Sequence, residues 1–128
     1  MSKCFAAAAV AAVLLASPLA LAQTAPAKVS DTPKGQVLVD AKGMTLYTFD
    51  KDSAGKSACN GPCATNWPPL MASADAKDMG DWTVVTRDDG AKMWAYKGKP
   101  LYTWKNDKAA GDTSGDGFAG NVWHIAKP

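Results

Sequence analysis

The sequence predicts a small all-β domain built from two tandem hairpin repeats, with little or no helix. A stretch of the form Gly-x-x-Leu-Tyr-Thr-aromatic-x-x-Asp occurs at residues 43–52 and again at 98–107. Short β-branched or alternating apolar runs, separated by turns that contain Gly or Asp, surround both copies. Because self-similarity at a fixed spacing is typical of repeated structural units, we expect two related halves around one aromatic-rich core.

Residues 1–22 have the composition of a secretory signal peptide. Lys3 gives a positive start, residues 5–15 are almost entirely Ala, Val and Leu, and Ala20-Leu21-Ala22 is a small-x-small cleavage site. We therefore expect a mature chain that begins at Gln23 and is periplasmic or secreted. A retained membrane anchor is the alternative, but the apolar run is short for a bilayer span. The residue just after the cleavage site is Gln23 and not a cysteine, so we expect no lipid anchor.

Charge and size limit the possible partners. The chain holds 14 Lys and Arg residues against 12 acidic residues, all of them aspartates, and Arg87 is its single arginine. Because the balance is close to neutral and no basic run is present, we expect no nucleic-acid partner. About a hundred residues remain after the leader, enough for one domain with a single small core.

The predicted β domain covers residues 36–128. It follows a stretch at 23–35 that has no apolar periodicity and is expected to be a flexible spacer. Repeat one is expected at about 36–70 and repeat two at about 91–126. Residues 71–80 are rich in Ala, Asp and Lys and are expected to connect the repeats, with one helical turn as the alternative.

The first half reads as a hairpin followed by a loop. We expect a strand at 36–40, a turn at 41–43 in which Gly43 takes a positive φ, and a strand at 44–49. The second strand carries large apolar groups on both faces, so we expect it to be covered on both sides. Residues 50–65 are expected to form an irregular loop. The following prolines favour an extended edge segment, with Trp67 packed beneath it.

In the second half, Asp-Gly and Lys-Gly turns separate short strands, and an Asp- and Gly-rich loop at 105–120 precedes the last one. The strands are expected at 81–86, 92–96, 100–104 and 121–126.

Two cysteines remain after the leader, Cys59 and Cys63. An even number of cysteines in a small exported domain favours a structural disulfide, and the intervening Asn-Gly-Pro turns readily. A redox-active pair is the alternative. Such pairs usually have two intervening residues at a helix N-terminus, and we expect no helix here.

The duplicated Tyr and Asp residues, Tyr47 with Asp52 and Tyr102 with Asp107, are the first candidate site. An Asp just past a strand end accepts backbone N–H groups and fixes the loop that follows. A tyrosine covers the core with its ring and ties its hydroxyl to that loop. Duplication favours this structural role, because each hairpin needs the same lock. Contact with a ligand is the alternative.

Metal binding is a second candidate. Asp112, Ser114 and Asp116 alternate as in the front half of a calcium loop, but Trp123 stands where the bidentate Glu belongs. A flexible Asp/Gly turn is therefore favoured, with weak calcium binding as the alternative. His124, the only histidine, is a candidate copper ligand together with a methionine. A structural, half-buried histidine is favoured, because one histidine falls short of most such sites.

No catalytic motif is found in the sequence, since Gly-x-Ser-x-Gly, His-Glu-x-x-His and a phosphate-cradling loop are all missing. We therefore expect that the protein is not an enzyme. The alternative is an enzyme that uses Asp52, Asp107 or Asp112 as a catalytic residue.

The sequence contains five tryptophans, and we expect most of them to pack in the core. The alternative is that some form a partly exposed platform for sugars, peptides or protein. The tryptophans are Trp67, Trp82, Trp94, Trp104 and Trp123.

The two Tyr-x-aromatic-x-x-Asp blocks, together with Cys59-x-Gly61-x-Cys63 and Asn66-Trp67-Pro68-Pro69, resemble a bacterial family of secreted repeats, also described as predicted lipoproteins. That family is defined by a tandem Tyr-x-[Phe/Trp/Tyr]-x-x-Asp motif. The resemblance spans about Val37 to Ile125. It implies an exported location and a repeat architecture, and it brings no known activity. Without the lipoprotein cysteine, the chain resembles a freely soluble member.

We therefore expect a non-catalytic binding or interaction module of the cell envelope. Its partner would be an envelope protein or a small ligand, and no cofactor is expected. The alternative is a periplasmic module that binds calcium weakly at residues 112–117 or copper at His124.

Overall fold

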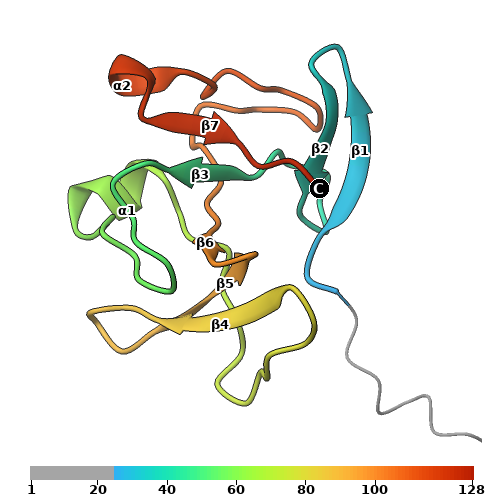
Figure 1. The fold of residues 1–128 in the computed structure, drawn as a ribbon. Helices are drawn as coiled ribbons and strands as arrows, with labels where there is room; N and C mark the ends of the chain where they lie inside the picture. The colour runs from blue at the N-terminus through green and yellow to red at the C-terminus, as the bar shows by residue number, and fades with distance from the viewer. Residues whose placement is uncertain (1–24) are drawn as a thin grey trace, which may run out of the picture.

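The computed structural model describes residues 25–128, so the expected signal peptide at 1–22 lies outside the described residues. The described chain consists mainly of short strands with two short helices, which confirms the all-β prediction (Figure 1). No helix among these residues is long and apolar enough to cross a bilayer. The elements are β1 Lys28–Thr32, β2 Gly35–Val39, β3 Tyr47–Phe49, α1 Pro62–Asn66, β4 Trp82–Thr86, β5 Lys92–Tyr96, β6 Lys99–Pro100, α2 Phe118–Asn121 and β7 Trp123–Ile125.

The strands form three small antiparallel sheets, β1–β2, β3–β7 and β4–β5–β6. The β3–β7 sheet places Tyr47 opposite Ile125 and Phe49 opposite Trp123. In Figure 1 this sheet runs between the β1–β2 hairpin at one end and the two helices at the other. The last strand of the second repeat therefore completes the motif strand of the first, and the two repeats form one body.

The N-terminal part of the domain differs from the prediction. Residues 28–32, expected to belong to the flexible spacer, form β1 and pair with β2 along its length. The physical reason is a tight turn: the Thr32 hydroxyl donates to the Gly35 carbonyl (2.8 Å), and Gly35 takes a φ of 97°. Strand β1 has the sequence Lys-Val-Ser-Asp-Thr, in which Val29 is the one apolar residue. No alternating apolar pattern marks it as a strand, so it is defined by the turn and by its pairing with β2.

As a result, the expected hairpin between 36–40 and 44–49 is only partly formed. Val39 bridges Thr45, and the Leu46 N–H donates to the Leu38 carbonyl (2.9 Å). The turn between them is present as predicted, with Gly43 at a φ of 85°. Because β2 pairs mainly with β1, the motif strand β3 is left to pair with β7.

The second half follows the prediction at 81–96. The strand expected at 100–104 is reduced to β6, and the helix α2 occupies the end of the loop expected at 105–120. β4 and β5 pair in register from Trp82–Tyr96 to Thr86–Lys92, and a turn at 97–98 leads into β6. Residues 71–80 contain no helix. The loop expected at 50–65 does contain one, α1, which has Pro62 in its first turn. Proline favours this position because its φ is already helical and its missing N–H would have no partner there.

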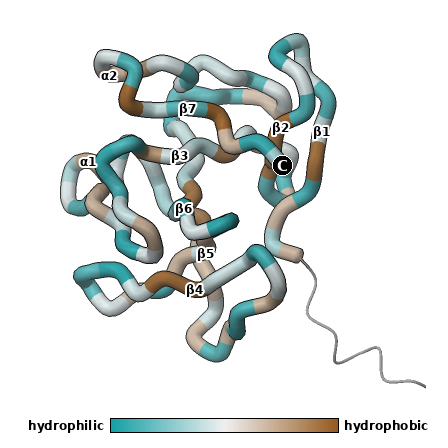
Figure 2. Tube along the Cα trace, in the orientation of Figure 1, coloured by the Kyte–Doolittle hydropathy of each residue, from teal (hydrophilic) through white to brown (hydrophobic). Residues whose placement is uncertain are grey.

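The motif strands are covered on both sides, as predicted. Side chains alternate across a strand, so Tyr47 and Tyr102 face a large aromatic cluster while Leu46 and Leu101 face a smaller aliphatic one. All four side chains have an exposed fraction of 0%. Figure 2 shows the same division along the chain, with hydrophobic stretches in the strands and hydrophilic residues in most of the turns.

A stack of aromatic rings forms the centre of the larger cluster. Trp67 lies between Trp123, with ring centroids 3.7 Å apart, and Trp104, with centroids 4.0 Å apart. Phe49 stacks on the far side of Trp123 at 4.2 Å. Each such contact stabilises the fold by about 0.5–1.5 kcal/mol beyond its buried area. The prediction that Trp67 packs in the core is confirmed, and its partners come from both repeats.

Gly115 lies against this stack and leaves no room for a side chain. A Cβ atom there would lie 2.7 Å from Trp67 Cη2 and 3.1 Å from Trp104 Cγ. We expect Gly115→Ala to lower the free energy of unfolding by about 1–3 kcal/mol in urea denaturation, because the rings must shift. Asn106→Ala, at an exposed position of the same loop, is the control and should change it by less than about 0.5 kcal/mol. Equal stability of the two variants would contradict a rigid stack.

Candidate functional site

The tyrosines of the two motifs lie directly opposite each other. The Tyr47 N–H donates to the Tyr102 carbonyl (2.8 Å), and the Tyr102 N–H donates to the Tyr47 carbonyl (3.0 Å). The two motif strands thus meet at the residue that both share. Their side chains are fully buried, so the polar ends of the rings must find partners inside the protein.

Those partners are the motif aspartates, and the pairing crosses between the repeats. The Tyr47 hydroxyl donates to Asp107 Oδ2 (2.6 Å), and the Tyr102 hydroxyl donates to Asp52 Oδ2 (2.7 Å). The expectation that each hairpin holds its own tyrosine–aspartate lock is therefore wrong. Each tyrosine binds the aspartate of the other repeat, because β3 and the 102 region face each other across the centre of the molecule.

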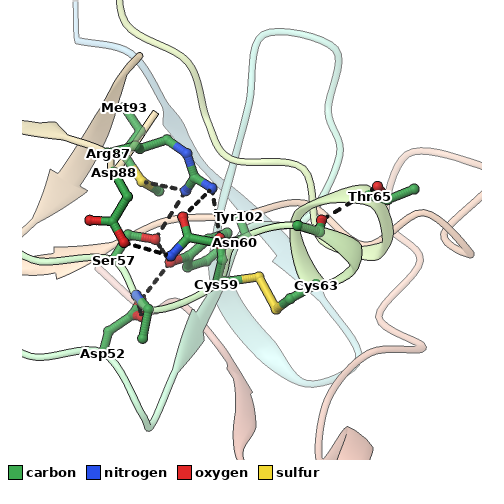
Figure 3. The surroundings of a disulfide bond; sticks show 12 residues. Asp52, Ser57, Cys59, Asn60, Cys63, Thr65, Arg87, Asp88, Met93 and Tyr102 are labelled. Carbon is green, nitrogen blue, oxygen red and sulfur yellow. Dashed lines mark hydrogen bonds between the residues drawn. A yellow bond between two sulfur atoms is a disulfide. The ribbon is translucent and has the colours of Figure 1, made fainter. Parts of the chain in front are cut away.

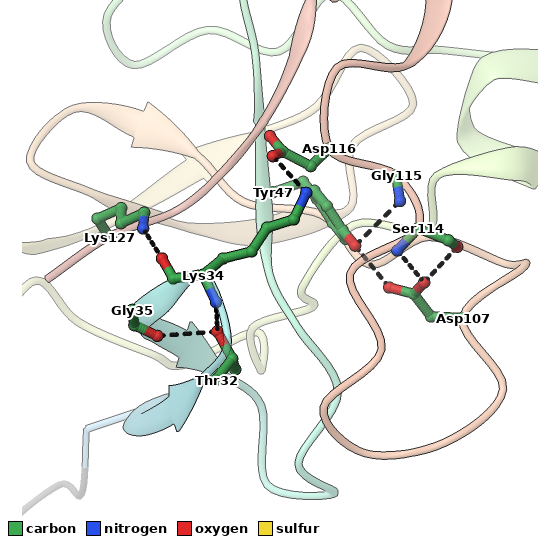
Figure 4. Close-up of polar contacts among 9 residues, drawn as sticks. All are labelled: Thr32, Lys34, Gly35, Tyr47, Asp107, Ser114, Gly115, Asp116 and Lys127. Atoms are coloured by element: carbon green, nitrogen blue, oxygen red, sulfur yellow. Dashed lines mark hydrogen bonds and ion pairs between the residues drawn. The ribbon is translucent and has the colours of Figure 1, made fainter.

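On one side, the Tyr47–Asp107 pair fixes the Asp- and Gly-rich loop (Figure 4). Asp107 Oδ1 accepts the Ser114 N–H (2.9 Å) and the Ser114 hydroxyl (2.6 Å). The Gly115 N–H donates to the Tyr47 hydroxyl (3.2 Å). One hydroxyl and one carboxylate thus hold residues 107–115 against the aromatic stack.

On the other side, the Tyr102–Asp52 pair belongs to a longer buried network (Figure 3). Asp52 Oδ1 accepts the Ala58 N–H (2.6 Å). Because the Tyr102 proton is directed at Asp52, the Ser57 hydroxyl donates to Tyr102 Oη (2.6 Å). Arg87 Nη1 in turn donates to Ser57 Oγ (3.0 Å). The result is a chain of hydrogen bonds, all donated in the same direction, from the Arg87 guanidinium to the Asp52 carboxylate.

Arg87 and Ser57, which are 5% and 3% exposed, belong to no sequence motif and were not predicted as site residues. Arg87 Nη2 also donates to the Cys59 carbonyl (2.6 Å), so this buried cation ties the strand β4 hairpin to the disulfide loop. A buried charge is tolerated only where hydrogen bonds replace water. The one available signal was that Arg87 is the only arginine among thirteen lysines.

The Cys59–Cys63 disulfide is confirmed, with the Cα atoms 5.2 Å apart. Cys59 is fully buried, and Cys63 lies half-buried in the first turn of α1. The expectation that no helix accompanies these cysteines is therefore wrong. α1 is five residues long and carries Cys63 as its second residue.

Burial raises the pKa of both tyrosine hydroxyls, and the hydrogen bonds to Asp107 and Asp52 raise it further. Burial also raises the pKa of Asp52, against the lowering effect of the Ala58 N–H and the Tyr102 hydroxyl. The tyrosines therefore keep their protons and act as hydrogen-bond donors at neutral pH. Their arrangement holds the structure together rather than supplying an exposed acid or base.

The predicted calcium ligands have separate partners. Asp112 Oδ2 accepts the Lys108 and Ala109 N–H groups (2.9 and 3.0 Å), which lower its pKa. Asp116 forms an ion pair with Lys34 (3.0 Å). Since Ser114 is bound to Asp107, the three side chains do not converge on one point.

The predicted copper ligand, His124, also has its own partner, because its Nε2 lies 2.8 Å from Asp50 Oδ2. Within residues 25–128, no group of three or more His, Cys, Asp or Glu side chains is arranged to hold a metal ion.

Two adjoining hollows, of about 330 and 270 Å³, open beside β3. Both are lined by Thr48, Asp50, Lys97 and Lys99, so they form one continuous depression, here called the inter-repeat groove. One half reaches Phe49 and Asp52, and the other reaches Tyr96, His124 and Lys127. The groove therefore lies between the β3–β7 sheet and the β5–β6 turn, with Thr48 and Asp50 contributed by the first repeat and Lys97 and Lys99 by the second.

Asp52 connects the groove to the buried network. Asp52 lines one hollow, and its carboxylate also accepts a hydrogen bond from the buried Tyr102 hydroxyl. Of the four motif residues, Asp52 is the one placed at this surface; Tyr47 and Tyr102 are fully buried, and Asp107 is 6% exposed. The groove was not predicted from the sequence, because the residues that form it are adjacent only after the repeats pack together.

The raised tyrosine pKa values predict a loss of stability in alkali. The folded protein retains protons above pH 10.0, the ordinary tyrosine value, while the unfolded chain releases them. The stability that the two protonated tyrosines contribute is therefore complete below that pH. It is lost as the pH rises towards and through the pKa values of these tyrosines in the folded protein. Urea denaturation on either side of pH 10.0 should show a fall in the free energy of unfolding. The fall should be less steep in Tyr47→Phe or Tyr102→Phe.

Tyr96→Phe is the control for this titration, because the Tyr96 ring does not belong to either tyrosine–aspartate pair. It should preserve the wild-type slope. The same alkaline slope in all three variants would show that the buried hydroxyls are not responsible.

A family model described as a secreted repeat of unknown function matches the chain twice, over residues 28–71 and 83–127. No curated protein and no solved structure matches the chain. The two matches together cover more than half of the chain, and each contains one copy of the Tyr–Asp motif. The first begins at β1, in agreement with the pairing of that strand. The protein belongs to this family of secreted repeats.

Proposed function

We propose that this protein is a non-catalytic binding module of the cell envelope, exported to the periplasm or secreted, and that the inter-repeat groove is its binding face. The observation that carries the proposal is the position of the groove. It lies where the two repeats meet, and side chains from both halves, Asp50 and Lys97 among them, line both of its hollows.

The size and composition of the groove support a binding role. The larger hollow, of about 330 Å³, lies at the lower end of the range of small-molecule sites, about 300 to 1,000 Å³, and the hollow of about 270 Å³ adjoins it. The lining combines lysine amines, aspartate carboxylates and an aromatic ring, a mixture that provides both contact area and orientation.

The rigidity of the walls also supports it. Thr48 and Asp50 lie in or next to β3, which is held by β7 and by the Tyr47–Tyr102 bridge. Asp52 is fixed by the Ala58 N–H and the Tyr102 hydroxyl. A wall that is ordered before the ligand arrives loses less conformational entropy on binding, which favours affinity.

The motif residues favour binding over catalysis. The hydroxyls of Tyr47 and Tyr102 are buried and keep their protons, and Asp107 is bound to Ser114 and Tyr47. These groups are therefore engaged with one another and do not meet at an open position where a substrate atom would react. We assign the motif the role of supporting the groove.

The proposal predicts that the groove lysines retain the protein on its envelope target. The labelled double variant Lys97→Ala/Lys99→Ala should bind the envelope fraction of the producing cells at least about tenfold more weakly than the unmodified protein. The control Lys42→Ala/Lys108→Ala removes the same charge at exposed positions that do not line the groove. It should bind normally. Equal retention of both variants, or no retention of the unmodified protein, would contradict the proposal.

A further inference from the structure

The groove presents hydrogen-bond donors and acceptors to the same ligand. Lys97 and Lys99 supply ammonium groups, which donate only. The Lys127 side chain also lines one hollow, but its ammonium donates to the Lys34 carbonyl (2.7 Å). Asp50 and Asp52 supply carboxylates, which accept only. A purely anionic ligand would meet the two aspartates, and a purely cationic one would meet Lys97 and Lys99. A ligand that carries both hydroxyl and carboxylate groups matches both sets.

The groove also offers aromatic surface at one end. Tyr96, which is half-buried, lines one of the two hollows. Aromatic rings pack well against ligands that have one apolar face and a polar rim. Because the two hollows adjoin and share four lining residues, a chain of successive units fits this shape better than one compact molecule.

Lys97 is held in an unusual backbone conformation at the centre of the groove. It takes a φ of 51° and is followed by Gly98 at 84°, so the β5–β6 turn has two successive left-handed residues. Asn or Gly is the common occupant of the first such position, because an ordinary side chain is disfavoured there. Backbone strain of this kind is concentrated at functional sites. Here the strained residue lines both hollows.

The Lys97 ammonium lies 5.2 Å from the centroid of the Tyr96 ring. This exposed contact is weak, and so it leaves the amine available to an anionic group.

We infer that the inter-repeat groove binds a carboxylate-bearing oligosaccharide, with Lys97 as its central cation. Lys97 and Lys99 contact the carboxylates, and Asp50 and Asp52 accept hydrogen bonds from sugar hydroxyls. This inference rests on the proposed function, since it takes the groove as the binding face and names the ligand class. The exported location of secreted repeats is consistent with an extracellular glycan.

The test uses three probes: an oligogalacturonate, a neutral galacto-oligosaccharide of the same length, and inorganic polyphosphate. NMR titration of the full domain should show shifts at the groove residues with the oligogalacturonate. The affinity should exceed that for the neutral sugar by at least about tenfold and should fall as salt is added. Equal affinity for the neutral sugar, or shifts confined to another face, would overturn the inference.

Lys97→Asn is the decisive variant, because asparagine adopts the left-handed conformation with less strain than lysine. It should keep or raise the thermal midpoint and weaken oligogalacturonate binding at least about tenfold. Lys42→Asn, outside the groove, is the matched control and should leave binding unchanged. Unchanged binding by Lys97→Asn, or a lowered midpoint, would refute the role given to this residue.

The envelope experiment separates this inference from the proposed function. If Lys97→Ala/Lys99→Ala abolishes envelope retention and only polyphosphate binds the groove, the saccharide class is wrong and the binding face stands. If retention does not depend on the groove, the proposed function fails whatever the probes show.

Discussion

Two hydrogen bonds between the repeats, one buried and one part-buried, hold the architecture of this protein together. The Tyr47 hydroxyl donates to Asp107 and the Tyr102 hydroxyl donates to Asp52, over 2.6 and 2.7 Å. In each pair the tyrosine and the aspartate come from different repeats. Loss of one partner would leave a buried hydroxyl or carboxylate without its hydrogen bond, at a cost of about 1–3 kcal/mol for each such group. Folding of one half is therefore coupled to the other.

The remaining packing follows from the pairing of each tyrosine with the aspartate of the other repeat. Once Tyr47 and Tyr102 face each other, β7 returns to pair with β3, and Trp123 from the second repeat stacks on Trp67 from the first. The same packing brings the β5–β6 turn up to the edge of β3. The groove arises at that junction, with Asp52 as the residue that belongs both to the buried pair and to the surface.

Local features of the sequence predicted much of the fold. Alternation along residues 44–49 identified a strand that is covered on both sides, because Leu46 and Tyr47 are both fully buried. The turn at Gly43, the β4–β5 hairpin and the Cys59–Cys63 disulfide were also predicted correctly. These features depend on a few neighbouring residues, whose side-chain period, backbone freedom or spacing determines the result.

Features that depend on distant contacts were not predicted. A duplicated Tyr–Asp motif is equally consistent with pairing inside each repeat and between repeats, because both arrangements contain the same residues. Strand β1 was missed since its pairing is set by the turn at Thr32 and Gly35. Arg87, Ser57 and the groove residues Lys97 and Lys99 carry no motif, so only packing of the two halves shows their roles.

A double-mutant cycle tests the exchange between repeats most directly. Tyr47→Phe is combined with Asp107→Ala in one cycle and with Asp52→Ala in another, and the free energy of unfolding is measured for each protein. The structure predicts a coupling energy of about 0.5–3 kcal/mol for Tyr47 with Asp107 and additivity within about 0.5 kcal/mol for Tyr47 with Asp52. Coupling of Tyr47 to Asp52, with none to Asp107, would contradict the account.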